Sequence, residues 1–215
     1  MTFKMRNIAG LASIIAAVTC FALPALAQTV PSLRADPFVD SGKGDKVHTA
    51  SGFVCPERVG RYVRNSVGEG GSPADGKVFC SYYALDSVYG TVQLTPLSGP
   101  YDAKKSLAGD FVEQVGIGGK QVDEKMVTVK PADGAKEAES FKPVEVYTRT
   151  YETAHLESLR YQIKFTGAAI NGWAVESIIE YASTRDDETA QNFLDFVYRS
   201  AETEVGKKQN AAPAK

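Results

Sequence analysis

The strongest constraint on the fold is an alternation of apolar and polar residues with a period of two. It is clearest at 88–94, 144–149 and 161–165, where valine, leucine, isoleucine and aromatic residues occupy alternate positions, together with Gly90 and Thr148. This period is typical of strands that bury one face, and β-branched and aromatic residues favour strands. The sequence therefore predicts a strand in each of these three segments.

A β-hairpin is predicted around Asn171-Gly172. Apolar alternation precedes this dipeptide and resumes after it, from Trp173 to Tyr181. Asn-Gly accommodates the positive φ angles that a tight hairpin turn requires. Weaker strand patterns at 58–65, 77–85 and 126–130 add further strands to the expected sheet.

Two segments follow a helical period instead. In Tyr101–Val115, apolar residues recur every four positions, and Gly116 is placed to end a helix. From Thr184 onward a second apolar stripe contains Ala190, Phe193, Leu194, Val197 and Ala201. The expected fold class is thus α+β, a mainly antiparallel β-sheet with two principal helices packed on it.

The order of these elements resembles that of the PsbP/DcrB-like secreted α/β sandwich proteins. The resemblance covers residues 50–202 and rests on the helix at 101–115, the hairpin at 159–181 and the closing helix that contains Phe193-Leu194-Asp195-Phe196-Val197-Tyr198-Arg199-Ser200. It implies an accessory or binding protein without known catalysis. The resemblance contains no invariant motif, so no functional residue of the family can be assigned to a position in this chain.

The amino terminus has the three parts of a secretory signal peptide. Lys4 and Arg6 precede an apolar stretch, and Ala25-Leu26-Ala27 forms a small-x-small cleavage site before Gln28. The sequence therefore predicts export, with a signal peptide at 1–27, no transmembrane segment in the mature chain, and a periplasmic or secreted location. Lipid attachment at Cys20 is an alternative, although Ala17-Val18-Thr19 matches the usual preceding tripeptide poorly.

The mature chain is expected to contain one domain. Residues 28–50 are rich in proline, glycine, serine and charged residues, which predicts an irregular lead-in. Residues 51–205 are long enough for a single α+β domain with a full core. A polar tail follows at 206–215 and is expected to be disordered.

Cleavage of the leader would leave two cysteines, Cys55 and Cys80. An even pair in an oxidising compartment predicts one disulfide. The alternative is a pair of buried thiols.

The charge balance argues against a nucleic-acid partner. The leader carries two basic residues and no acidic one, so the mature chain has 22 basic and 26 acidic residues. Nucleic-acid binders ordinarily show a basic stripe, and the sequence has only Lys207-Lys208 in its polar tail.

No catalytic, metal or cofactor motif stands out. The glycine-rich segment Gly116–Lys120 lacks the spacing of a phosphate-binding loop. His48 and His155 are the only histidines, and they are interpreted as solvated or capping residues. The acidic clusters at 36–45 and 186–188 lack the spacing of a calcium loop. We therefore expect no cofactor and no metal site, and an enzyme is the less favoured reading.

The most favoured binding surface is a group of polar residues on the strand positions that alternate with the apolar set. It comprises Tyr89, Tyr147, Arg149 and Tyr151. The alternation places five further polar residues on the same face: Gln93, Gln162, Lys164, Glu176 and Glu180. Tyrosine beside charge suits recognition of a protein. An ordinary solvated sheet face, or a face covered by a helix, would give the same pattern.

Two functions follow from these features. The first is a non-catalytic periplasmic or secreted accessory protein that binds an envelope or extracellular protein through the tyrosine-bearing face. The second is a small-molecule binding protein with a cleft between sheet and helices, lined by Trp173 or Tyr181. A pocket in the structure would favour the second, and a flat aromatic surface the first.

Overall fold

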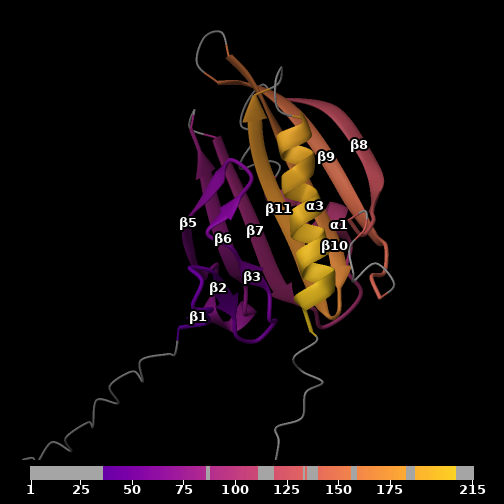
Figure 1. Cartoon of the computed structure of the whole chain (residues 1–215). Coiled ribbons are helices and arrows are strands. Elements are labelled where there is room, and N and C mark those ends of the chain that lie inside the picture. Colours follow the sequence, from indigo (N-terminus) through magenta and orange to yellow (C-terminus); the bar gives the residue numbers. More distant parts are fainter. Residues whose placement is uncertain are drawn as a thin grey trace, which may run out of the picture. The chain divides into compact units, whose positions relative to one another are not determined.

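An eight-stranded antiparallel sheet dominates the protein (Figure 1). A computed structural model describes residues 36–85, 88–110, 119–132, 134, 140–155, 159–182 and 187–206. The strand order is β4 (Arg58–Val59), β5 (Tyr62–Glu69), β6 (Val78–Ala84), β7 (Val88–Pro96), β11 (Trp173–Ala182), β10 (Leu159–Ile170), β9 (Val144–His155) and β8 (Lys120–Val129). The described residues all lie within one compact unit.

The three strands predicted from alternation are confirmed as parts of β7, β9 and β10. The predicted hairpin is confirmed as well, because β10 and β11 pair up to Ile170 and Trp173 around the Asn171-Gly172 turn. Both turn residues have positive φ, 47° and 82°, as this kind of tight turn requires. The weaker patterns correspond to β4 with β5, to β6, and to the end of β8.

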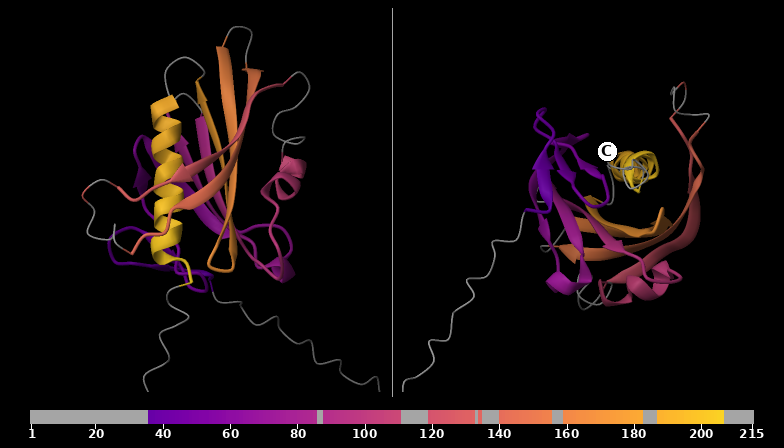
Figure 2. Two further views of the ribbon diagram at one scale, coloured as in Figure 1. Left: turned by 90° about the vertical axis from the view of Figure 1, so that its right-hand side faces the viewer. Right: turned by 90° about the horizontal axis from the view of Figure 1, so that it is seen from below.

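The long helix α3 (Asp187–Glu204) packs on one face of the sheet, which we call the α3 face. Figure 2 shows the sheet curving around this helix. The predicted apolar stripe is confirmed, since Ala190, Phe193, Leu194, Val197 and Ala201 are all buried. They join the inward residues of the strands in the main hydrophobic core.

The predicted fold class is wrong in its helical part. Among the described residues the structure is mainly antiparallel β-sheet, with 52% strand, 18% helix and one helix of seven or more residues. The predicted helix at 101–115 is represented by α1 (Ala103–Ser106), a single turn, and by helical residues at 108–110, while 111–118 lie outside the described residues. The physical reason lies at Leu107, which caps the carboxyl end of α1 and is completely buried against the strands, so packing on the sheet limits α1 to a single turn.

A small three-stranded sheet lies beside the main one. It consists of β1 (Phe38–Asp40), β2 (Lys46–His48) and β3 (Val54–Cys55). Residues 36–50, expected as an irregular lead-in, thus contribute two strands. His48, interpreted from the sequence as solvated or capping, is instead buried, and its ring contacts the rings of Phe38 and Trp173.

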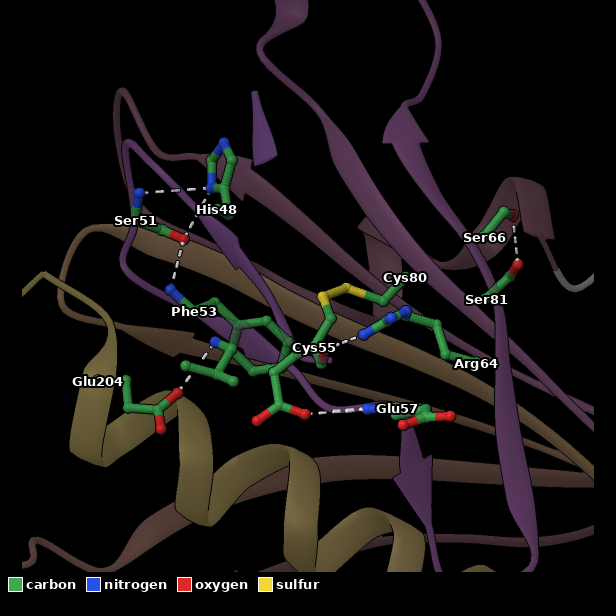
Figure 3. The surroundings of a disulfide bond; sticks show 12 residues. His48, Ser51, Phe53, Cys55, Glu57, Arg64, Ser66, Cys80, Ser81 and Glu204 are labelled. Carbon is green, nitrogen blue, oxygen red and sulfur yellow. Dashed lines mark hydrogen bonds between the residues drawn. A yellow bond between two sulfur atoms is a disulfide. The ribbon is translucent and has the colours of Figure 1, made fainter. Parts of the chain in front are cut away.

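Cys55 and Cys80 join the small sheet to β6 (Figure 3). Their Cα atoms are 6.2 Å apart, and both side chains are completely buried. The guanidinium of Arg64 adds a second connection, because it donates to the carbonyl oxygens of Cys55 and Gly44 at 2.6 Å each. The predicted cysteine pair is therefore confirmed as a disulfide.

Candidate functional site

The second face of the sheet, which we call the α1 face, is only partly covered. Leu107 packs there with Tyr147, Ile163 and Phe165 in a small hydrophobic cluster. The register explains this placement, because Phe165 lies opposite Arg149 and Ile163 opposite Tyr151, so these side chains share one face. Both faces of the central strands are therefore buried. One lies under α3, and the other lies under residues 101–107, which we call the α1 segment.

A close approach at Gly167 fixes the α1 segment on the sheet. A Cβ atom at Gly167 would lie 2.5 Å from the Tyr101 hydroxyl and 3.1 Å from the Ala103 Cβ. The Tyr101 hydroxyl donates to Glu176 Oε1 at 2.8 Å, and burial, together with the Glu176 charge, raises the Tyr101 pKa. Glycine in a strand interior often marks such a contact. Gly167 is therefore the one residue from which the sequence could have indicated that another segment packs on β10 here.

A polar network surrounds Glu124 on β8. Its Oε1 accepts from Lys104 Nζ at 2.7 Å and from the Tyr147 hydroxyl at 3.0 Å. These two hydrogen bonds lower the pKa of the Glu124 carboxyl. Burial, followed by the hydrogen bond to Glu124, raises the pKa of Tyr147 to about 12. The network keeps Glu124 ionised and Tyr147 protonated near neutral pH.

Arg149 extends this network along β9. Its Nε donates to Gln121 Oε1 at 2.7 Å and lies 3.7 Å from Glu124 Oε2. The guanidinium carbon is 5.2 Å from the centre of the Tyr151 ring, within the range of a cation–π contact. Three of the four predicted binding residues, Tyr147, Arg149 and Tyr151, are therefore close together on the α1 face.

The fourth predicted residue, Tyr89, lies apart from this group, on β7. It is 55% exposed and stands directly opposite Tyr83, which is 44% exposed. Leu85, at the end of the same β6–β7 hairpin, is 84% exposed. This hairpin, rather than the Tyr147 region, carries the exposed aromatic surface, because Tyr147 itself is only 8% exposed.

Gln162 and Lys164 differ from the sequence interpretation, because the β9–β10 register places them on the α3 face. There the Tyr181 hydroxyl donates to Gln162 Oε1 at 2.7 Å, and Lys164 Nζ lies 5.5 Å from the Tyr181 ring centre. These three residues line a polar pocket beside α3. Tyr181 thus borders a polar cleft between sheet and helix, whereas Trp173 is buried against His48.

The sheet forks between β9 and β10. The ladder between them ends at the pair Tyr147–Gly167. Beyond that pair, β9 extends to Val144 in register with β8, and β10 extends to Ile170 in register with β11. We call the opening between 144–146 and 168–170 the fork.

An open pocket of about 760 Å³ lies at the fork, and we call it the fork pocket. Its lining includes Tyr101 and Lys104 of the α1 segment, Met126 of β8, Glu145 and Tyr147 of β9, 167–170 of β10, and Glu202 of α3. The α1 segment and α3 cover opposite faces of the sheet, yet residues of both line this one pocket. The lining of the fork pocket therefore includes residues from both faces of the sheet.

Charges of both signs surround the fork pocket. Lys104 is paired with Glu124, and Lys142 is exposed at the rim. Glu145 accepts from the Thr128 hydroxyl at 2.6 Å, and Glu202 lies on the α3 side. Apolar walls with a few polar groups are typical of sites that bind organic ligands non-covalently. Sequence reasoning missed Tyr101, Lys104, Met126, Lys142 and Glu202, because only the tertiary fold brings them together.

Within the described ranges, no group of three histidine, cysteine or acidic side chains is placed to hold a metal ion. No helix in the same ranges combines the length and apolar character needed to cross a bilayer. The glycine-rich segment Gly116–Lys120 lies largely outside the described residues, as does the side chain of His155.

No family model matches the chain, and no curated protein matches it. The relation to the PsbP/DcrB-like group therefore stays a prediction from element order. The fork pocket and the exposed β6–β7 hairpin are the two features from which a function can be inferred.

Proposed function

We propose that this protein is an exported, non-catalytic binding protein that holds its ligand in the fork pocket. The observation that carries the proposal is an open pocket of about 760 Å³ at a fork of the sheet. Its volume lies within the range of about 300 to 1,000 Å³ that is usual for ligand sites. The leader-like amino terminus and the buried disulfide support an extracytoplasmic location.

The lining residues suit binding. Tyr101 and Tyr147 have raised pKa values and stay protonated, so their hydroxyls act as hydrogen-bonding groups and not as bases at neutral pH. Both hydroxyls and Lys104 are already held by Glu176 and Glu124. Side chains fixed in this way form a preorganised wall, which reduces the entropy cost of binding.

An accessory protein that binds an envelope or extracellular protein is the second candidate. The observation that favours it is the exposed group of Tyr83, Leu85 and Tyr89 on the β6–β7 hairpin. Tyrosine is enriched at protein interfaces, and grouped exposed apolar side chains often mark one. In this version Tyr89 would make the contact, and Tyr147 would support the sheet beneath the α1 segment.

A pair of alanine substitutions tests the fork-pocket proposal. Ala169 is exposed and lines the pocket, so Ala169→Phe should fill it. Ala74 is exposed in the short helix η1 (Pro73–Asp75) and does not line the pocket, so Ala74→Phe is the matched control. Both variants should fold with wild-type circular dichroism and wild-type thiol content.

Thermal unfolding would then be recorded against a library of metabolites and short peptides. A ligand at 100 times its Kd stabilises the folded state by about 2.7 kcal/mol, or about 5 to 10 °C for a domain of this size. Genuine ligands should raise the Tm of the wild type and of Ala74→Phe but not of Ala169→Phe. Ligands that stabilise all three proteins equally would place binding elsewhere and contradict the proposal.

A further inference from the structure

We infer that the ligand of the fork pocket is an extended polypeptide segment that inserts as an additional strand beside β10. This inference rests on the proposed function, because it names the ligand class of the same pocket. The recognition would be by main-chain hydrogen bonds to a strand edge, with side-chain pockets on both faces of the sheet.

At the fork, β10 is paired on one edge and unpaired on the other. On its far side, β10 is fully paired with β11, through Ala168–Val175, Ala169–Ala174 and Ile170–Trp173. On its near side the ladder to β9 has already ended at Gly167. The β9-facing backbone edge of 168–170 therefore has no strand partner among the described residues. The β10-facing edge of 144–146 likewise has no strand partner among the described residues, because these residues pair only with β8, on their other side.

The backbone groups of an unpaired strand edge require hydrogen-bond partners. Backbone N–H and C=O groups are strong donors and acceptors that are satisfied by protein or by water. At the fork they border an open pocket, which water can fill in the free protein. A polypeptide in the extended conformation offers donors and acceptors at the spacing of a neighbouring strand, about 3.3 Å per residue, so about three residues match each free edge.

The lining of the fork pocket is compatible with an extended peptide. Successive side chains of an extended peptide point to opposite faces of a sheet. The fork pocket is lined on both faces, by Tyr101 and Lys104 on the α1 face and by the buried Glu202 on the α3 face. A compact metabolite would use one side of the opening, whereas an inserted strand uses both.

The charges around the pocket agree with this ligand class. Cations (Lys104, Lys142) and a carboxylate (Glu145) are present at the rim, and the Glu202 carboxylate is buried in the lining. A site dominated by one sign would favour a strongly charged metabolite. A mixed rim around Tyr147 and Met126 suits a neutral peptide backbone whose side chains alternate in character.

The test begins with a phage-displayed library of random nonapeptides selected on the full mature protein. We expect enriched peptides that bind the wild type and Ala74→Phe and that lose affinity at least tenfold on Ala169→Phe. The best binder is then synthesised with a single N-methyl group at each position in turn. N-methylation removes one backbone donor, so positions that face β10 should lose about tenfold or more in affinity.

The decisive result is the pattern of those losses. Sensitive positions should alternate with tolerant ones, because only every second residue of a strand directs its N–H toward a given neighbour. Uniform tolerance of N-methylation, or a library that yields no binder, overturns the inference. If metabolites from the thermal screen still bind wild type but not Ala169→Phe, the fork pocket remains a ligand site and only the ligand class is wrong. If neither peptides nor metabolites bind, both proposals fail.

Discussion

Two fully buried tyrosines provide a sharp test of the packing around α3. Tyr198 and Tyr82 are both inaccessible to solvent, and both contact the main core. They differ in the environment of the hydroxyl group. The same substitution, tyrosine to phenylalanine, should therefore have opposite consequences at the two positions.

The Tyr198 hydroxyl is part of a buried polar cluster. It lies 2.8 Å from Thr166 Oγ1 and donates to the Val175 carbonyl at 3.2 Å, and Thr166 Oγ1 is in turn 2.6 Å from Ser177 Oγ. The cluster joins α3 to β10 and β11. Tyr198→Phe removes the two hydrogen bonds of the Tyr198 hydroxyl and leaves its former partners buried, so the free energy of unfolding should fall by about 1 to 3 kcal/mol.

The Tyr82 hydroxyl has no hydrogen-bond partner among the described residues. Its ring packs edge to face on Phe193, with ring centres 5.6 Å apart, and that contact does not need the oxygen. Burial raises the pKa of Tyr82, which is consistent with a hydroxyl enclosed by the core. Tyr82→Phe removes a buried group that lacks a partner, so the protein should be unchanged or more stable by about 1 kcal/mol.

Urea unfolding of the oxidised protein measures both effects. Trp173 is the only tryptophan and is buried, so its fluorescence reports global unfolding. The two variants and the wild type should share one m value, since the exposed surface on unfolding is the same. The reasoning is refuted if Tyr82→Phe destabilises as much as Tyr198→Phe, because the Tyr82 hydroxyl would then have a partner. A neutral Tyr198→Phe would refute the role of the cluster.

Three further predictions concern the disulfide, the α1 contact and the buried histidine. Cys80→Ser opens a bridge to Cys55 that spans 25 positions, so the free energy of unfolding should fall by about 3 to 4 kcal/mol, and unreduced wild type should show no free thiol on labelling after unfolding. Gly167→Ala should displace Tyr101, because the added Cβ would lie 2.5 Å from its hydroxyl; faster hydrogen exchange in the α1 segment would show this, and unchanged exchange would contradict it. Burial lowers the pKa of His48 below 6.5, so the unfolded chain takes up a proton that the folded protein does not, and stability should decrease as pH falls below about 6.5. His48→Gln should remove that pH dependence in urea titrations between about pH 5 and 7 if His48 is its source.

The parts of the fold that could be predicted are those encoded by short-range pattern. The period of two located β7, β9 and β10, and Asn171-Gly172 located the turn between β10 and β11, because turn geometry depends on the two residues that adopt positive φ. The stripe on α3 was also evident, since one face of a long helix must be apolar to be buried. The expected removal of a leader that contains Cys20 left Cys55 and Cys80 as the one possible pairing, and these two cysteines form the disulfide.

The face assignments could not be predicted in the same way. In β10, Phe165 is buried under the α1 segment and Thr166 is buried under α3, so the middle of the strand has no solvent-exposed face from which the parity can be read. Only the register with β9 shows that Phe165 and Arg149 share a face and that Lys164 lies on the other. Register depends on contacts distant in sequence, which single-sequence alternation does not contain.

The fork follows from how the two parts of the sheet are attached to one helix. Arg199 of α3 donates from Nε to the Lys130 carbonyl at 2.8 Å, which holds the end of β8. The Asn171 side chain donates to the Val205 carbonyl, just beyond α3, at 2.9 Å, which holds the β10–β11 turn. Because β9 pairs with β8 and β10 pairs with β11, these attachments tie the two sides of the fork to separate points near the carboxyl end of α3. The opening is thus fixed by specific contacts on both sides, and a ligand that enters it meets strand edges already held apart.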